Sequence, residues 1–460
     1  MNLPRIIIAG LSGGSGKTLV SLGLARAFVE RGLKVKPFKK GPDYIDAAWL
    51  GLAAKADPAN LDPHIMDREL VLPLFLDRMQ GSDLGLVEGN RGLFDGKDLS
   101  GSCSTSELSR RLQAPVVLVI DGTKMTRTAA AIVKGCLEFE PGLDLAGVII
   151  NRTAGVRHRA MLKAAIEEYT GVPVLGMLPK IAEDPIPERH MGLVSVREYA
   201  RAEEILGSLA RIVEESVDID AVLAIANKGS GLELSGHEML WPRSVADGQR
   251  PTIGYVRDAA LWFYYEENLE ALRRAGAELV EVSLLDDGPW PELHGLYLGG
   301  GFPETQAEIL AANVSRREQV KALADAGMPI YAECGGFMYL GKFLRFQGQE
   351  YPMAGVFPVT TEIHAKPQGL GYVEATVVAD TPFFAKGDTL LGHEFHYSRM
   401  TSQDPGLAWA LRMERGQGMG GAADGLIYKN VWAGYTHIHA LGAKQWATNF
   451  ALAAQGFSAP

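Results

Sequence analysis

The chain has 460 residues, 47% hydrophobic and 22% charged, a composition typical of globular proteins that excludes a disordered, fibrous or disulfide-stapled chain. Its net charge of -10 argues against nucleic acid and anionic membranes as partners, so any phosphate must be bound by local features. It contains three cysteines without a Cys-x-x-Cys pair, and no apolar run approaches the ~20 residues of a membrane span. We therefore expect a cytoplasmic protein without membrane segments.

The first half of the chain alternates short apolar runs with helix-like stretches, which is the signature of a doubly wound parallel sheet. The strand candidates are continuously apolar, as expected where helices cover both faces of a sheet. The strands are expected at 5–9, 84–87, 116–120, 145–150 and 172–177, and the helices at 18–31, 104–112, 126–139 and 158–169.

Turn-forming residues gather between 216 and 250 and interrupt this pattern. A second α/β series follows, with strands expected at 252–256, 279–282, 295–298 and 329–332 and helices at 266–275 and 320–326. A length of 460 residues fits two or three domains of about 100–200 residues each. We predict two domains, 1–215 and 251–460, joined by a linker at 216–250.

The first predicted strand leads into the glycine-rich segment GLSGGSGKT at 10–18, and an amphipathic helix follows. In this context backbone N–H groups and the helix N-terminus attract phosphate, Lys17 neutralises its charge and Thr18 can ligate Mg²⁺. Leu11 stands where the strict pattern has its first glycine, so a simple glycine turn is the alternative. The expected phosphate-binding residues are Gly13, Gly14, Ser15, Gly16, Lys17 and Thr18.

Acidic side chains follow other predicted strands of this domain. Glu88 ends the strand at 84–87, whereas Asp43, Asp46 and Asp95 stand near glycine or proline. Carboxylate oxygens suit Mg²⁺, and the alternative for each of the three aspartates is an ordinary turn-forming role. Asn151 follows the strand at 145–150, where its amide either reads an adenine edge or only ends the strand.

The strand expected at 329–332 is followed by a sharp turn at Cys334 and then by two glycines and a helix. Glycines after a nucleophile leave backbone N–H groups open as an oxyanion hole, and a helix N-terminus lowers the pKa of a thiol. The glycine cluster at 299–301 is a second source of oxyanion donors. A buried, inert cysteine is the alternative.

A cysteine nucleophile needs a base, usually histidine. His437 and His439 alternate along a strand-like segment and share one face, so either suits this role. His393 and His396 have the spacing of a metal-ligand pair, but no third ligand is evident. The residues alone leave the roles of these four histidines open.

Twelve segments taken in order resemble the cobyrinic acid a,c-diamide synthases, glutamine-dependent enzymes of corrinoid biosynthesis. Among them are AGLSGGSGKT, FKKGPDYID, NLDPHIM, VEGNRGLFDG, GVIINR, YLGGGFPE, PIYAECGGFMYL, GHEFHYSR and YTHIHA. The resemblance implies a dethiobiotin synthetase-like P-loop domain followed by a class I glutaminase-like α/β domain. It also accounts for Leu11, because the phosphate loop of that fold has five residues between its first glycine and Gly-Lys-Thr.

The resemblance implies a glutaminase site in the second domain. Cys334 would attack the amide carbon of glutamine, and His437 would activate the thiol and protonate the departing ammonia. Gly301 and Gly335 would stabilise the oxyanion.

The first domain would use ATP and Mg²⁺ to phosphorylate a carboxylate of a tetrapyrrole, and ammonia would displace the phosphate. The resemblance implies Thr18, Asp43 and Glu88 as metal ligands, Tyr44, Asp46 and Asp95 near the tetrapyrrole, and Asn151 at adenine. Lys39, Lys40 and Arg91 are candidates to offset the negative charge of the substrate.

Two features depart from the expected pattern. No acidic residue stands two positions after His437, where class I glutaminases usually complete a triad, so we expect a sluggish glutaminase. The segment at 47–50 differs from many family members, which keeps siroheme or nickel-sirohydrochlorin open as the substrate. A P-loop NTPase switch of the partitioning type is the alternative from another class, and it would not require Cys334. The partners expected are small molecules, and a homodimer is compatible with the sequence.

Overall fold

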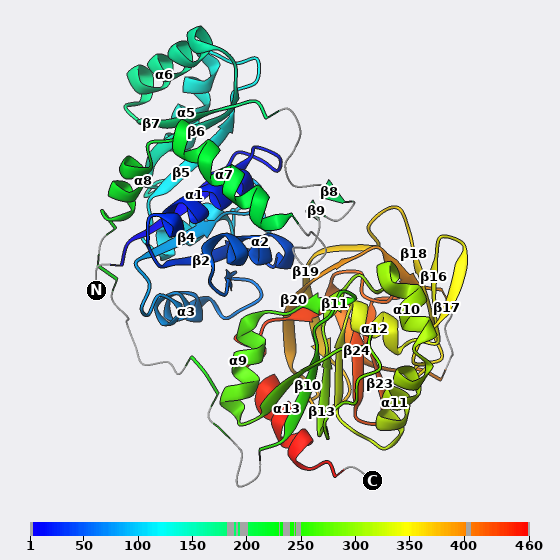
Figure 1. Ribbon diagram of the computed structural model, residues 1–460. Coiled ribbons are helices and arrows are strands. Elements are labelled where there is room, and N and C mark those ends of the chain that lie inside the picture. The colour runs from blue at the N-terminus through cyan, green and yellow to red at the C-terminus, as the bar shows by residue number, and fades with distance from the viewer. Residues whose placement is uncertain are drawn as a thin grey trace. The chain divides into compact units, whose positions relative to one another are not determined.

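The computed structural model describes residues 3–181, 188–189, 192–193, 201–229, 231–232, 240–242, 244, 250–401 and 406–458. The chain divides into two compact units (Figure 1). The first contains Met1–Pro63 and Arg68–Glu238, and the second contains His64–Asp67 and Met239–Pro460. The division after Glu238 falls within 216–250, part of which lies outside the described residues.

The described part of the first unit is built on a parallel sheet of seven strands in the order β3-β2-β4-β1-β5-β6-β7. These strands are β1 Arg5–Gly10, β2 Val35–Lys40, β3 Ala59–Leu61, β4 Leu84–Glu88, β5 Val116–Asp121, β6 Leu145–Thr153 and β7 Val174–Pro179. The helices are α1 Lys17–Glu30, α2 Tyr44–Ala54, α3 Val71–Arg78, α4 Thr105–Arg111, α5 Thr128–Phe139, α6 Val156–Thr170, α7 Ala202–Ser216 and α8 Ile219–Ala226. The short strands β8 Glu188–Arg189 and β9 Gly192–Leu193 pair with each other.

This strand order confirms the doubly wound parallel sheet predicted from the sequence. The chain runs outward from β1 to β3 and then returns through β4, so right-handed crossovers cover both faces with helices. All six residues of β1 are therefore buried, and α1 and α7 lie side by side over the sheet (Figure 1). The carboxyl ends of β1 and β4 are adjacent where the strand order reverses, which is where ligands bind in such sheets.

The second unit contains a mixed sheet, whose described strands run in the order β12-β10-β13-β15-β24-β23-β22-β19-β20-β25. Their bounds are β10 Thr252–Val256, β12 Glu278–Val282, β13 Gly295–Leu298, β15 Ile330–Glu333, β19 Gly369–Val377, β20 Thr389–His396, β22 Ala408–Arg415, β23 Ala423–Tyr428, β24 Val431–Gly434 and β25 His437–Ile438. The other strands are β11 Leu261–Phe263, β14 Gly300–Gly301, β16 Phe343–Phe346, β17 Gln349–Pro352, β18 Thr360–Ile363 and β21 Ser398–Met400. The helices are α9 Glu266–Ala275, α10 Ala307–Ala312, α11 Val314–Asp325, α12 Gly335–Leu340 and α13 Trp446–Gln455.

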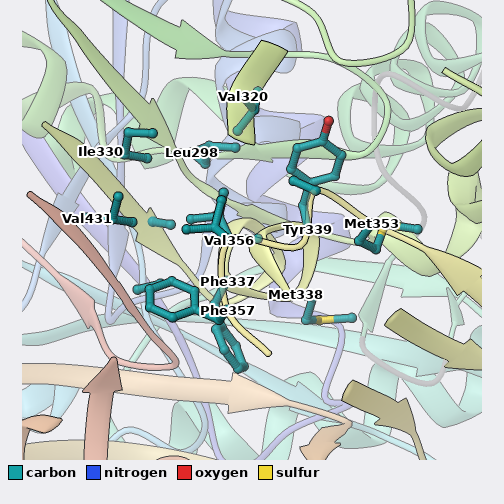
Figure 2. Packing of buried hydrophobic residues seen from close by; sticks show 14 of the residues in the cluster. Leu298, Val320, Ile330, Phe337, Met338, Tyr339, Met353, Val356, Phe357 and Val431 are labelled. Carbon is teal, nitrogen blue, oxygen red and sulfur yellow. The ribbon is translucent and has the colours of Figure 1, made fainter. Parts of the chain in front are cut away.

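Helix α12 is embedded in one core of the second unit. Its residues Phe337 and Tyr339 are buried in the same cluster as Leu298 on β13, Ile330 on β15 and Val431 on β24 (Figure 2). Burying these large side chains stabilises the unit by roughly 1.5–3 kcal/mol each. The turn that joins β15 to α12 is therefore held between two well-packed elements.

Helix α8 occupies residues that we predicted to be linker, and it packs in the first unit. Its apolar residues Ile219, Val222 and Ile225 recur at helical spacing and are buried. In the described part of the chain, every helix is too short or too polar to cross a lipid bilayer.

Candidate functional site

The glycine-rich segment forms a loop between β1 and α1. Gly14 and Gly16 have positive φ angles of 74° and 93°, which L-residues rarely adopt. A methyl group added at Gly16 would come within 2.0 Å of the Asn151 side-chain nitrogen, so this position has no room for a side chain. Lys17 begins α1 and is buried, and burial together with the charge of Lys39 lowers its pKa.

The loop is held from the end of β6. The Asn151 side-chain nitrogen donates to the Ser15 carbonyl at 3.2 Å, and the Asn151 side-chain oxygen accepts from the Arg152 N–H at 2.9 Å. Arg152 also donates to the Gly14 carbonyl at 3.2 Å and pairs with Asp121 at 2.8 Å. Asn151 thus positions the loop in this structure, and its contact with adenine stays a prediction.

Glu88 lies at the centre of a buried polar cluster beside the loop. Its Oε1 accepts from Thr18 Oγ1 at 2.8 Å and from Lys39 Nζ at 2.7 Å. Asp43 caps α2 by accepting from the Asp46 N–H at 2.9 Å, and burial together with Asp46 raises the pKa of Asp43 to about 6. Two of the three residues predicted to bind Mg²⁺, Thr18 and Glu88, are therefore in direct contact, and Asp43 is linked to them through Asp46 and Lys39.

The donor set fits a hard cation. Glu88 is fully buried, and its Oε2 has no hydrogen-bond partner in the described residues. A buried carboxylate oxygen without a partner is costly, and an oxygen-coordinated cation such as Mg²⁺ would satisfy it. The hydroxyl of Thr18, another predicted ligand, donates to the other oxygen of the same carboxylate and so lies close to a cation bound there.

The sequence led us to expect that Lys39 and Lys40 offset the negative charge of a substrate, but in the structure they have other partners. Lys39 is fully buried and pairs with Glu88 and with Asp46, the latter at 2.6 Å. Burial opposes its charge, but Asp46 and Glu88 prevail and raise the pKa of Lys39. Lys40 Nζ lies 3.6 Å from buried Asp62. Both lysines thus neutralise carboxylates of the protein itself.

The predicted substrate residues lie at the start of α2 and in the loop after β4. Tyr44 is the first residue of α2, and the carboxylate of Asp46 two residues later is bound to Lys39. Asp95 accepts from the Gly92 N–H at 2.8 Å, and the neighbouring Leu93 N–H donates to Gly10 at 2.7 Å. The loop that carries Asp95 is therefore attached to the phosphate loop, whereas substrate contacts by Tyr44, Asp46 and Asp95 stay predictions.

Three of the four residues at 47–50 are interior. Ala47, Trp49 and Leu50 are buried in α2. The departure from the family pattern thus lies largely in the packed interior of the first unit, and its bearing on the substrate stays untested.

Cys334 occupies the sharp turn that the sequence predicted between β15 and α12. Its backbone has φ 48° and ψ −100°, an unfavourable conformation for any residue except glycine. The turn is fixed on both sides, because the Cys334 N–H donates to Gly434 at 2.7 Å and the Gly336 N–H donates to Gly299 at 3.0 Å. Strained residues held in this way are common at nucleophiles.

The second glycine cluster lies against this turn. A methyl group at Gly335 would come within 3.0 Å of the Gly301 nitrogen, and one at Gly300 within 2.6 Å of His437 Cε1. Tyr264 supports the cluster, since its hydroxyl accepts from the Gly299 N–H at 2.8 Å. The residues predicted to form the oxyanion hole and the base therefore gather around the cysteine turn.

The thiol of Cys334 does not have the lowered pKa that we expected from the helix N-terminus. Burial, and secondly the charge of Glu304, raise its pKa, and a backbone hydrogen bond from Gly335 only partly opposes them. Helix α12 has six residues, so its dipole is too weak to outweigh desolvation. The thiol is consequently protonated at neutral pH in the free protein and needs a base to remove its proton.

His437 lies in β25 and is almost completely buried. Its Nδ1 is 3.2 Å from Glu333 Oε2, and its ring stacks on His393 with centroids 4.8 Å apart. Burial, followed by the charges of His437 and His64, lowers the pKa of His393, so this neighbour stays neutral. Of the two candidate bases, His437 is the one beside the glycine cluster.

The other histidines have partners of their own. His439 Nε2 lies 3.6 Å from Glu267 on α9. The His396 ring stacks on Tyr435 with centroids 3.6 Å apart. Among the described residues, no group of three or more histidine, cysteine or acidic side chains has a geometry suited to a metal ion, which leaves the His393 and His396 pair without a third ligand.

Asp424, on β23, orients the segment that leads to His437. Its carboxylate accepts from the Tyr435 N–H at 3.0 Å, the Thr436 N–H at 2.9 Å and the Thr436 hydroxyl at 2.7 Å. On the other side of His437, Asn268 donates to the Ile438 carbonyl at 3.0 Å. The base is thus held by residues from two distant elements.

The Asp424→Ala variant is expected to lower the free energy of unfolding of the second unit by about 2–4 kcal/mol, because three buried donors lose their acceptor. Urea unfolding followed by tryptophan fluorescence measures this, since all tryptophans but Trp49 belong to the second unit. Asp325→Ala is the control, as Asp325 is largely exposed and pairs at the surface. An unchanged midpoint for Asp424→Ala would contradict this account of the segment.

Sequence reasoning missed Glu333, Asp424 and Asn268. Glu333 carried a signal, because a charged residue in a strand that is otherwise apolar and buried must have a specific partner. Asp424 and Asn268 stand in unremarkable sequence, and only their three-dimensional contacts reveal them.

The phosphate loop on a doubly wound sheet and the cysteine turn in a mixed sheet define a glutamine amidotransferase joined to a nucleotide-binding domain. Residues 6–194 match the CobQ/CobB/MinD/ParA nucleotide binding domain, and residues 252–445 match the CobB/CobQ-like glutamine amidotransferase domain.

Full-length relatives narrow this class. The chain is 42% identical over 447 residues to the cobyrinate a,c-diamide synthase of Magnetococcus marinus, covering 97% of this chain and 96% of the relative. It is 39% identical to the enzyme of the same name from Archaeoglobus fulgidus (98% and 97% covered) and 41% identical to that from Listeria monocytogenes (95% and 96% covered). The chain belongs to the cobyrinate a,c-diamide synthase family.

Proposed function

We propose that this protein amidates the a- and c-carboxylates of cobyrinic acid in cobalamin biosynthesis, using ATP and either glutamine or ammonia. The observation that carries the proposal is that one chain contains both halves of the chemistry. A phosphate loop adjoins the Glu88 cluster in the first unit, and a strained Cys334 turn lies beside glycines and His437 in the second. A nucleotide switch would need only the first half.

In the second unit Cys334 forms a bond to the amide carbon of glutamine. His437 takes the thiol proton and passes it to the nitrogen as the carbon–nitrogen bond breaks, which releases ammonia and leaves a thioester that water hydrolyses. The N–H groups of Gly301 and Gly335 stabilise the oxyanion. The strained backbone at Cys334 and its position beside Gly335 support this assignment.

In the first unit the residues from Gly13 to Thr18 bind the phosphates of ATP. A carboxylate oxygen of the substrate attacks the γ-phosphorus, and ADP leaves. Ammonia then attacks the resulting acyl phosphate, so that phosphate departs and an amide remains. Phosphorylation is needed because a carboxylate has no adequate leaving group.

Thr18, Glu88 and Asp43 would hold Mg²⁺, and the unpartnered Oε2 of Glu88 supports this. When bound, the cation supplies charge neutralisation on the phosphates. Tyr44, Asp46 and Asp95 would contact the tetrapyrrole, and Asn151 would hold the phosphate loop and approach the adenine. A cytoplasmic location and a homodimer belong to the same proposal, and light scattering tests the latter.

Incubation of the purified protein with ATP, Mg²⁺ and glutamine tests the substrate. Mass spectrometry of cobyrinic acid, siroheme and nickel-sirohydrochlorin after separate incubations should detect two acid-to-amide replacements on cobyrinic acid. If only siroheme or nickel-sirohydrochlorin is amidated, the proposed reaction type stands but the proposed substrate is wrong. An unchanged mass for all three tetrapyrroles would contradict the proposal.

A further inference from the structure

Glu333, the last residue of β15, is a buried acid directly before the nucleophile. Its Oε1 accepts from the Tyr331 hydroxyl and from the Ile438 N–H, both at 3.1 Å. Its Oε2 lies 3.4 Å from the Tyr297 hydroxyl and 3.2 Å from His437 Nδ1. A buried charge is tolerated only when it is paired and hydrogen-bonded, and Glu333 meets both conditions.

The groups around Glu333 donate hydrogen bonds to it and so favour a negative charge on its carboxylate. Burial first and the Glu333 carboxylate second raise the pKa of Tyr297 and of Tyr331 well above the usual value, so both hydroxyls remain donors at neutral pH. The Ile438 backbone contributes a third donor, which cannot reverse its role. His437 Nδ1, which makes the remaining contact, therefore also faces a carboxylate oxygen that accepts a hydrogen bond.

This arrangement decides which nitrogen of His437 is the base. A carboxylate accepts hydrogen bonds only, so in the neutral imidazole the proton must reside on Nδ1. Nε2 then carries the lone pair and is the nitrogen that can accept a proton. The His437 ring edge at Cε1 borders Gly300 in the cluster beside Cys334.

We propose that Glu333 is the positioning residue of a Cys334–His437–Glu333 triad, and that it supplies from the strand before the nucleophile the acid that is missing after His437. The inference rests on the proposed glutaminase function of Cys334 and His437. His439, which stands where class I glutaminases usually carry that acid, is instead paired with Glu267. On this account the glutaminase has a third triad member, and the rate of glutamine hydrolysis tests whether the enzyme is sluggish, as the sequence predicted.

The Glu333→Gln variant keeps the shape of the side chain and removes its charge. With the amide oxygen accepting from Tyr331 and Ile438, the amide NH₂ points at His437 Nδ1 and donates to it, which moves the imidazole proton to Nε2. In a serine protease triad the corresponding change leaves the geometry intact and lowers kcat by about 10⁴-fold. We expect glutamine hydrolysis to lose about 10²–10⁴-fold in kcat, with KM for glutamine nearly unchanged.

The matched control is Glu281→Gln. Glu281 also accepts from a tyrosine hydroxyl, that of Tyr255 at 3.2 Å, but it belongs to β12 and contacts no histidine in the described hydrogen bonds. It should hydrolyse glutamine like the wild type. Both variants should amidate the tetrapyrrole at the wild-type rate with ammonium, which verifies that the first unit is folded and active.

A second measurement detects the tautomer of His437 directly. Long-range ¹⁵N–¹H NMR of histidine-labelled protein, with His437 assigned from the spectrum of His437→Gln, should show the Nδ1–H tautomer in the wild type. In Glu333→Gln it should show the Nε2–H tautomer. An Nε2–H tautomer in the wild type, or a Glu333→Gln rate within threefold of it, would overturn the triad. Absence of glutamine hydrolysis in the wild type would overturn the proposed function instead.

Discussion

The Cys334→Ala variant is expected to lose glutamine-driven amidation completely while keeping ammonium-driven amidation at the wild-type rate. Removing the nucleophile of a comparable triad costs about 10⁶-fold in kcat, so no glutamine-dependent product should be detectable. Ammonium bypasses this step, because the acyl phosphate forms in the other unit of the chain. The substitution also relieves strain at a φ of 48° only slightly, since alanine disfavours that conformation too.

The measurement is amide formation by mass spectrometry with glutamine or ammonium as the nitrogen source, together with direct assay of glutamate release. Cys136→Ala is the matched control, because Cys136 is also a buried, free cysteine but belongs to α5 of the first unit. Loss of both activities in Cys334→Ala would refute the division of labour between the two units, and so would retention of glutamate release.

The Glu88→Gln variant should show the opposite pattern, losing amidation with either nitrogen source while glutamine hydrolysis continues. Its buried carboxylate binds both Thr18 and Lys39, and it is the proposed anchor of the cation that neutralises phosphate charge. With a neutral amide at position 88, Lys39 is left paired with the carboxylate of Asp46. The cation at the same time loses a negatively charged ligand. We expect a loss of about 10³-fold, which corresponds to several kcal/mol of transition-state stabilisation.

Initial rates at saturating ATP, measured over a series of Mg²⁺ concentrations, check this prediction. Glu140→Gln is the control, because Glu140 likewise accepts from a hydroxyl, that of Ser106, and from a cation, Arg110, away from the phosphate loop. It should retain the wild-type rate. If Glu88→Gln amidates as fast as Glu140→Gln, Glu88 is not part of the nucleotide site.

The features that could be predicted from sequence are those whose residues adjoin along the chain. The phosphate loop from Gly13 to Thr18 follows a strand and opens a helix, and the turn at Cys334 does the same, so local residue order determines both. The parallel sheet was predictable for the same reason, since buried strands such as β5 are continuously apolar. Helix α8 was missed because turn-forming residues follow it closely.

Features that depend on long-range contacts could not be predicted. The lowered pKa expected for Cys334 was wrong because burial and Glu304, neither visible in the local motif, outweigh a short helix. Lys39 was expected to face a substrate, but the fold buries it against Glu88, which lies 49 residues away.

The two chemical centres of this protein can be found from contiguous residues, because a phosphate loop and a nucleophile turn need particular residue types at restricted backbone angles. The charged groups that accompany them are brought together by folding. Glu333 and His437 are 104 residues apart, and they meet because β24, which pairs with β15, leads directly into β25. Electrostatic pairing depends on distance in space and on the loss of water, and neither can be read from residue order.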